Sequence, residues 1–106
     1  MIELGDDNFE PMIQQGLWVV DFWSPTCAPC RVVSPILADL AREWQGEVHF
    51  ASVNADTELR TRFAQQISGL PSVVVFQDGR PVDLILGAHP ARVYRDRIAG
   101  VRSVHP

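Results

Sequence analysis

Hydrophobic residues occur along the chain in runs and periods that predict both strands and helices. Residues 17–23 (LWVVDFW) form a nearly unbroken apolar run, which is the pattern of a central strand buried on both faces. Residues 48–54 predict a second strand. Residues 73–76 and 82–86 flank the turn sequence QDGR, which predicts a β-hairpin.

The longest helix is expected over residues 28–44, after the buried strand. Apolar side chains recur there at helical spacing, and charged side chains take the opposite side. The expected apolar face consists of Val32, Val33, Ile36, Leu37, Leu40, Ala41 and Trp44. Gly46 is expected to end this helix.

Three further helices are expected. A short first helix follows Asp6 and Asp7 and ends near Gly16. Another covers residues 57–66, and a last one begins at Pro90. The inward side chains are expected to be Leu59, Phe63 and Ile67 for the former, and Tyr94, Ile98 and Val101 for the latter.

The resulting element order is β-α-β-α-β-α-β-β-α, which predicts an α/β fold. Helical crossovers between the early strands imply that these strands are parallel, and the closing hairpin adds an antiparallel edge. The chain has 106 residues, of which 46% are hydrophobic and 21% charged. We therefore expect a single domain, residues 1–106, that can bury a core without disulfides or metals.

Charge and hydropathy argue against several classes of partner. The formal net charge of −4 disfavours nucleic acid as a main partner. No segment is long and apolar enough to predict a membrane span. The first residues, MIELGDD, contain no basic segment followed by an apolar run, so we expect a cytoplasmic protein.

The two cysteines, Cys27 and Cys30, lie in the sequence SPTCAPCR between the buried strand and the longest helix. At a helix start, unsatisfied backbone N–H groups and the helix dipole stabilise a thiolate. We therefore expect the pKa of Cys27 to lie below the value of about 8.5 of a free thiol. Cys30 is expected to lie deeper against the sheet and to be the less nucleophilic thiol. This placement favours a redox pair.

Two other interpretations of the cysteines are less favoured. A purely structural disulfide would close a loop too short to remove much entropy from the unfolded chain. A closed metal site would need two ligands beyond the pair. The three histidines, His49, His89 and His105, show no ligand spacing with one another.

A series of motifs resembles the thioredoxin family over about residues 2–101. The motifs are VVDFW at residues 19–23, the CxxC with Pro29 before its second cysteine, Pro35, WQG at 44–46, VNAD at 53–56, GLPS at 69–72, FQDG at 76–79 and Gly87-Ala88. The resemblance implies the thioredoxin fold, with a central mixed five-stranded sheet flanked by four helices. It also implies a redox-active disulfide in which Cys27 attacks a substrate disulfide and Cys30 resolves the mixed disulfide.

Asp21 is the other candidate for chemistry. A carboxylate inside an apolar run is costly unless it is paired or protonated, so burial should raise the pKa of Asp21. The resemblance implies that Asp21 accepts the proton of Cys30 as that thiol attacks. Many family members have a lysine where this chain has Ser52, and the absence of this counter-charge is expected to raise the pKa of Asp21 further.

The resemblance also implies a substrate-binding surface. Leu70 and Pro71 match the family's cis-proline loop, which faces the cysteines, and the backbone at Leu70 is expected to pair with substrate as a strand would. A low apolar rim is expected from Gly69, Gly87 and Ala88, although turn geometry alone could require the glycines.

The active-site sequence departs from the usual Trp-Cys-Gly-Pro-Cys of the family. Thr26 replaces an aromatic residue of the partner-contact surface, and Ala28 replaces a glycine, whereas Pro29 is retained. We expect the reaction type to survive both changes, and we expect partner choice and reduction potential to be affected.

These features predict a protein-disulfide reductase that acts by dithiol–disulfide exchange without a cofactor or metal. Its expected partners are protein disulfides and an electron donor of the thioredoxin-reductase type, and it is expected to be a monomer. Two alternatives stay open: a disulfide isomerase or oxidant of the same fold, and a binding or assembly partner that does not turn over its cysteines.

Overall fold

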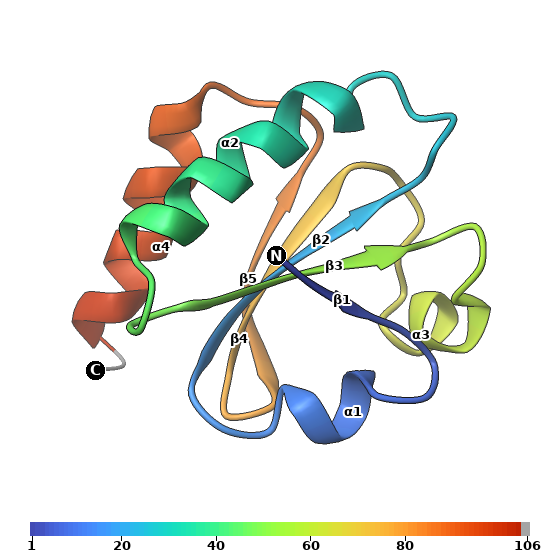
Figure 1. Ribbon diagram of the computed structural model, residues 1–106, viewed down its shortest axis with the longest axis horizontal. Helices are drawn as coiled ribbons and strands as arrows, with labels where there is room; N and C mark the ends of the chain where they lie inside the picture. The colour runs from blue at the N-terminus through green and yellow to red at the C-terminus, as the bar shows by residue number, and fades with distance from the viewer. Residues whose placement is uncertain (105–106) are drawn as a thin grey trace.

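The computed structural model describes residues 1–104, which form a five-stranded sheet and four helices in the predicted order. The elements are β1 (Ile2–Leu4), α1 (Phe9–Met12), β2 (Leu17–Trp23), α2 (Cys30–Glu43), β3 (His49–Asn54), α3 (Leu59–Ala64), β4 (Ser72–Gln77), β5 (Arg80–Leu86) and α4 (Ala91–Val104). The predicted α/β fold, a mixed sheet flanked by helices, is therefore confirmed (Figure 1). Within the described residues, no helix is long and apolar enough to cross a membrane.

The strand order is β1-β3-β2-β4-β5. β2 pairs in parallel with β3 and antiparallel with β4, so it is hydrogen-bonded on both sides at the centre of the sheet. Its residues alternate between two buried layers, which explains the unbroken apolar run. The hairpin between β4 and β5 turns at Asp78 and Gly79, which both have positive φ, as a type I′ turn requires.

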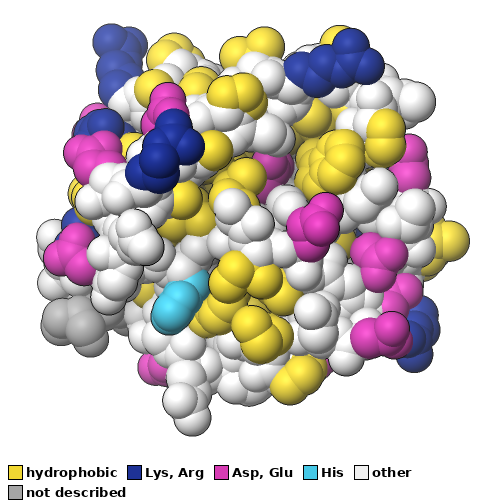
Figure 2. Space-filling model, viewed as in Figure 1, with side chains coloured by type: hydrophobic (Ala, Val, Ile, Leu, Met, Phe, Trp, Pro, Cys, Tyr) yellow, Lys and Arg dark blue, Asp and Glu magenta, His cyan; other side chains and the backbone are white. Residues whose placement is uncertain are grey.

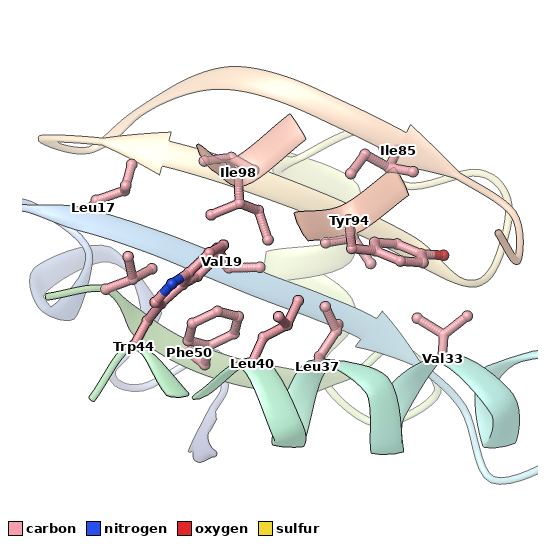
Figure 3. Close-up of a cluster of buried hydrophobic side chains, with 13 residues drawn as sticks. Leu17, Val19, Val33, Leu37, Leu40, Trp44, Phe50, Ile85, Tyr94 and Ile98 are labelled. Atoms are coloured by element: carbon pink, nitrogen blue, oxygen red, sulfur yellow. The ribbon is translucent and has the colours of Figure 1, made fainter. Parts of the chain in front are cut away.

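Each face of the sheet has its own apolar layer. Helices α2 and α4 lie side by side over one face, where Leu37, Leu40, Tyr94 and Ile98 pack against Val19 (Figures 1 and 3). The second layer contains Phe9, Trp18, Val20, Phe22 and Phe76, among others. Arg95 of α4 makes two hydrogen bonds of 2.7 and 2.8 Å to Glu43 of α2, joining the two helices at the surface.

Some predicted side-chain directions were wrong. Leu59 and Phe63 were expected to point inward, but they are 47% and 71% exposed, and Thr61 is the buried residue of α3. The reason is a long-range contact: the Asp6 carboxylate accepts hydrogen bonds from the Thr61 N–H at 2.7 Å and the Thr61 hydroxyl at 2.8 Å. This pairing turns Thr61 toward Asp6, in the segment between β1 and α1, and the apolar residues of α3 outward.

Helix α2 also differs from the expectation at its start. It begins at Cys30 rather than at residue 28, and Pro29 is its N-cap. Val33, Leu37 and Leu40 form its buried stripe, as expected, but Val32 is 60% exposed because it lies to one side of that stripe.

The register of the sheet places three loops at one end of the molecule. Phe22, near the end of β2, pairs with Ser72 at the start of β4, and Ser72 pairs with Leu86 at the end of β5. The segment after β2, the segment before β4 and the segment after β5 therefore meet at the same edge. These are the segments that contain the cysteines, Pro71 and Gly87.

Candidate active site

A short loop holds the cysteine pair at the end of β2. Ser24 is buried, and its hydroxyl accepts a hydrogen bond of 3.2 Å from the Thr26 N–H. The Ser24 carbonyl accepts a hydrogen bond of 3.1 Å from the Cys27 N–H. The buried serine thus fixes the backbone just before the first cysteine. Sequence reasoning gave Ser24 no role.

Cys27 and Cys30 form a disulfide, with their Cα atoms 5.3 Å apart. Cys30 is 2% exposed, as expected, whereas Cys27 is only half-buried and lies among the exposed residues Thr26, Ala28 and Pro29. The backbone N–H of Cys30, the first residue of α2, donates a hydrogen bond of 3.3 Å to Cys27 Sγ. The more accessible sulfur therefore accepts a hydrogen bond from a backbone N–H group at the helix start. This contact favours its thiolate form.

Asp21 lies in the centre of the sheet with no exposed surface. It pairs with Ser52 on β3 and with Val73 on β4. Its Oδ2 accepts a hydrogen bond of 2.6 Å from the Ser34 hydroxyl of α2, and its Oδ1 has no hydrogen-bond partner among the described residues. Burial raises the pKa of Asp21 from the ordinary 3.8 to about 6, against the lowering effect of the Ser34 hydrogen bond. The predicted direction of the pKa shift is confirmed.

Among residues 1–104, the surroundings of Ser52 supply no cation to Asp21. Ser52, Trp23 and Asn54 line a surface hollow of about 490 Å³, whose other walls include Glu3 and Glu58. Figure 2 shows acidic side chains gathered on the side of the molecule where Figure 1 places β1 and α3. These side chains therefore supply no positive charge in place of the lysine that many family members have at the position of Ser52.

The loops before β4 and after β5 are tied together. The Leu70–Pro71 peptide bond is cis, as the family resemblance implied, and the Pro71 carbonyl accepts a hydrogen bond of 2.9 Å from the Gly87 N–H. Gly87 has a φ of +84°, which favours glycine on backbone grounds alone. Gly69 lies so close to Leu86 that a Cβ there would be 3.1 Å from the leucine side chain.

Tyr94 holds the second of these loops from inside the core. Its hydroxyl donates a hydrogen bond of 3.0 Å to the Gly87 carbonyl and accepts one of 3.2 Å from the His89 N–H. The ring is completely buried under α4 (Figure 3). The predicted apolar stripe identified Tyr94 as a core residue. It did not predict the hydrogen bond from the Tyr94 hydroxyl to Gly87, because Gly87 lies outside the helix, seven residues before Tyr94.

No metal site is evident in the part of the chain that the structure describes. Among residues 1–104, no three His, Cys, Asp or Glu side chains are grouped so that they could hold a metal ion. His49 stacks on Trp18, and the His89 ring contacts Tyr94. His105, the third candidate ligand from the sequence, lies outside the described residues.

An accessible sulfur joined to a buried sulfur at a helix start, with a buried carboxyl group in the strand before them, defines the class of thiol–disulfide oxidoreductases. Comparison with known proteins agrees. The model of the thioredoxin family matches residues 1–99. The chain is 33% identical to the thioredoxin of Staphylococcus saprophyticus over 85% of this chain and 86% of the relative. It is 31% identical to the thioredoxin of Staphylococcus haemolyticus over 99% of this chain and 97% of the relative.

The chain belongs to the thioredoxin family. The disulfide and the family together show a thiol–disulfide oxidoreductase that reduces protein disulfides.

Asp21→Asn is expected to stabilise the oxidised protein at high pH only. The unfolded aspartate ionises near 3.8 and the folded one near 6, so the parent loses stability as pH rises through this window. The loss amounts to about 3 kcal/mol and persists at higher pH. The asparagine variant does not undergo this loss, so its stability relative to the parent should rise by about 3 kcal/mol between about pH 3 and about pH 8.

Urea unfolding across this pH range measures the difference. Asp96→Asn, at an exposed position on α4, is the matched control and should show no such trend. A stability difference between Asp21→Asn and the parent that stays constant with pH would contradict the assignment of a raised pKa to Asp21.

Proposed function

We propose that Cys27 is the nucleophile of the reduced protein. Its half-buried sulfur, the exposed residues around it and the hydrogen bond from the Cys30 N–H support this role. The Cys27 thiolate attacks one sulfur of a substrate disulfide, and the other substrate sulfur leaves as a thiolate, which takes a proton from solvent. The product is a mixed disulfide between Cys27 and the substrate.

Cys30 then resolves the mixed disulfide. Its thiol gives a proton to the Asp21 carboxylate, and its sulfur attacks Cys27, so that the Cys27–Cys30 bond forms as the bond to the substrate breaks. The second substrate sulfur leaves as a thiolate, which also takes a proton from solvent. The substrate disulfide has been reduced to two thiols, and the protein has been oxidised to its disulfide. The burial of Cys30 supports this order, because resolution needs only an intramolecular neighbour.

We propose that substrate lies across the edge where the three loops meet. Its contacts are Thr26, Ala28 and Pro29 beside Cys27, Leu70 and Pro71 before β4, and Gly87 and Ala88 after β5. The exposure of the first three residues and the hydrogen bond between Gly87 and Pro71 support one continuous surface. Thr26 and Ala28 then give this surface a partner preference different from that of the usual family sequence.

The protein is further proposed to act as a cytoplasmic monomer with one domain. A donor of the thioredoxin-reductase type would return it to the dithiol form. The thioredoxin relatives, which match over nearly the full chain, support the single domain.

Insulin reduction tests the roles of the two cysteines. With dithiothreitol as donor, the parent should accelerate the precipitation of reduced insulin. Cys27→Ser should lower the rate to that of dithiothreitol alone, since no nucleophile remains. Cys30→Ser should also lose turnover. When the reduced variant is mixed with insulin after dithiothreitol has been removed, it should accumulate a mixed disulfide that mass spectrometry detects. Cysteine variants that kept the parent's rate would favour the binding-partner alternative, and trapping through Cys30 would reverse the assigned roles.

Tyr94→Phe tests the substrate surface. The variant keeps the buried ring and loses the two hydrogen bonds that fix the loop after β5. Its KM for insulin should rise about fivefold with little change in kcat, because a less ordered loop weakens substrate binding throughout the reaction. The rate of its reaction with the small disulfide dithionitrobenzoate, which does not need the loop, should stay unchanged. Equal losses with both substrates would contradict the loop's role.

A further inference from the structure

Ser34 lies one helical turn after Cys30, on the same side of α2. It is half-buried, and together with Cys30 it lines a hollow of about 320 Å³. The remaining walls come mainly from Trp23, Pro25 and Pro35. Ser34 therefore lies between the hollow that it shares with Cys30 and the Asp21 carboxyl group beneath the helix.

The hydroxyl of Ser34 makes the one hydrogen bond that the Asp21 carboxyl group receives within residues 1–104. It donates to Oδ2 at 2.6 Å, while Oδ1 stays without a hydrogen-bond partner in the described chain. One carboxylate oxygen is thus held in place, and the other is available to take a proton.

Within residues 1–104, no cation near the Asp21 carboxyl group replaces this hydrogen bond. The neighbouring strands present Ser52 and Val73. On α4 the titratable group is Tyr94, whose own pKa is raised by burial and, to a smaller degree, by the charge of Asp21. On α2 the cation Arg31 lines the same hollow as Ser34, but its guanidinium donates a hydrogen bond of 3.2 Å to the Pro25 carbonyl. Cys30, also on α2, is the proposed proton donor. The hydrogen bond from the Ser34 hydroxyl is therefore what stabilises the charged form of the Asp21 carboxyl group.

We propose that Ser34 is a positioning residue for thiol–disulfide exchange: it holds the Asp21 carboxylate ionised and leaves its Oδ1 free to accept the Cys30 proton. This inference rests on the proposed function of Asp21 as the base. Ser34 takes over part of the role that a nearby positive charge would have, by a contact from the helix rather than from β3. Ser34 acts only through Asp21 and does not touch the substrate.

The pH dependence of the resolving step tests the inference. When the reduced protein is mixed with dithionitrobenzoate, the second thionitrobenzoate is released by the attack of Cys30, in a phase whose rate does not depend on reagent concentration. This rate should rise with pH as Asp21 ionises near 6 and then level off. In Ser34→Ala the rise should move up by about one pH unit, which is the size expected for a lost hydrogen bond to a charged group.

At about pH 6 the variant should therefore be about fivefold slower than the parent, and at about pH 8.5 the two rates should converge. Ser34→Thr keeps a hydroxyl and should restore the parent's profile. Ser103→Ala removes a helix hydroxyl that bonds only to the Ala99 carbonyl at the far end of α4, and it should leave the profile unchanged. A uniform loss of rate at all pH values in Ser34→Ala would indicate a merely structural role and overturn the inference.

Asp21→Asn separates this inference from the function on which it rests. If Asp21→Asn leaves the resolving step and its pH profile unchanged, Asp21 is not the base and the proposed function of this residue fails. If Asp21→Asn removes the rise but Ser34→Ala retains the parent's profile, only the role of Ser34 is overturned. The inference predicts that Ser34→Ala has no further effect on the profile in the Asp21→Asn background, since Ser34 acts through the carboxyl group.

Discussion

One packing constraint determines the chemistry of this protein: α2 begins directly over the end of the central strand. Because the helix starts at Cys30, that sulfur is enclosed, while Cys27, in the loop before it, stays within reach of solvent. The same helix covers Asp21 and removes its carboxyl group from water. Two sulfurs separated by only two residues thereby acquire different environments, and a carboxyl group of raised pKa lies in the strand beneath them. The burial of Asp21 reduces stability at neutral pH, so the fold carries a stability cost at the position of the proposed base.

The proposed substrate surface follows from the register of the sheet rather than from any single motif. β2 and β4 run antiparallel, and so do β4 and β5, so the ends of β2 and β5 meet the start of β4 at one edge. Hydrogen bonds then fix the loops relative to one another, from Gly87 to Pro71 and from Tyr94 to the loop after β5. A peptide laid across this edge would meet backbone groups of three segments that are far apart in the sequence.

The sequence predicted the features that depend on local pattern. The apolar run of β2, the helical period of α2, the placement of the cysteines at the strand–helix junction and the raised pKa of Asp21 all follow from neighbouring residues. The features that it missed depend on contacts across the fold. Asp6 turns α3 by bonding to Thr61, which exposes Phe63 against the helical pattern. The bond from Ser34 to Asp21 had one local signal, the spacing of four residues from Cys30, but its partner lies in another element. The cis form of the peptide bond before Pro71 came from the family resemblance, because residue types alone do not distinguish the two isomers.

The central claim is that the fold divides two chemically identical thiols into an exposed nucleophile and a buried resolving group. Alkylation of the reduced protein by iodoacetamide as a function of pH, with each cysteine followed by mass spectrometry, tests this division most directly. Cys27 should react faster than free cysteine at neutral pH, with an apparent pKa below about 8.5, while Cys30 stays protected in the folded protein. Labelling of Cys27 no faster than free cysteine, or labelling of Cys30 first, would contradict the claim.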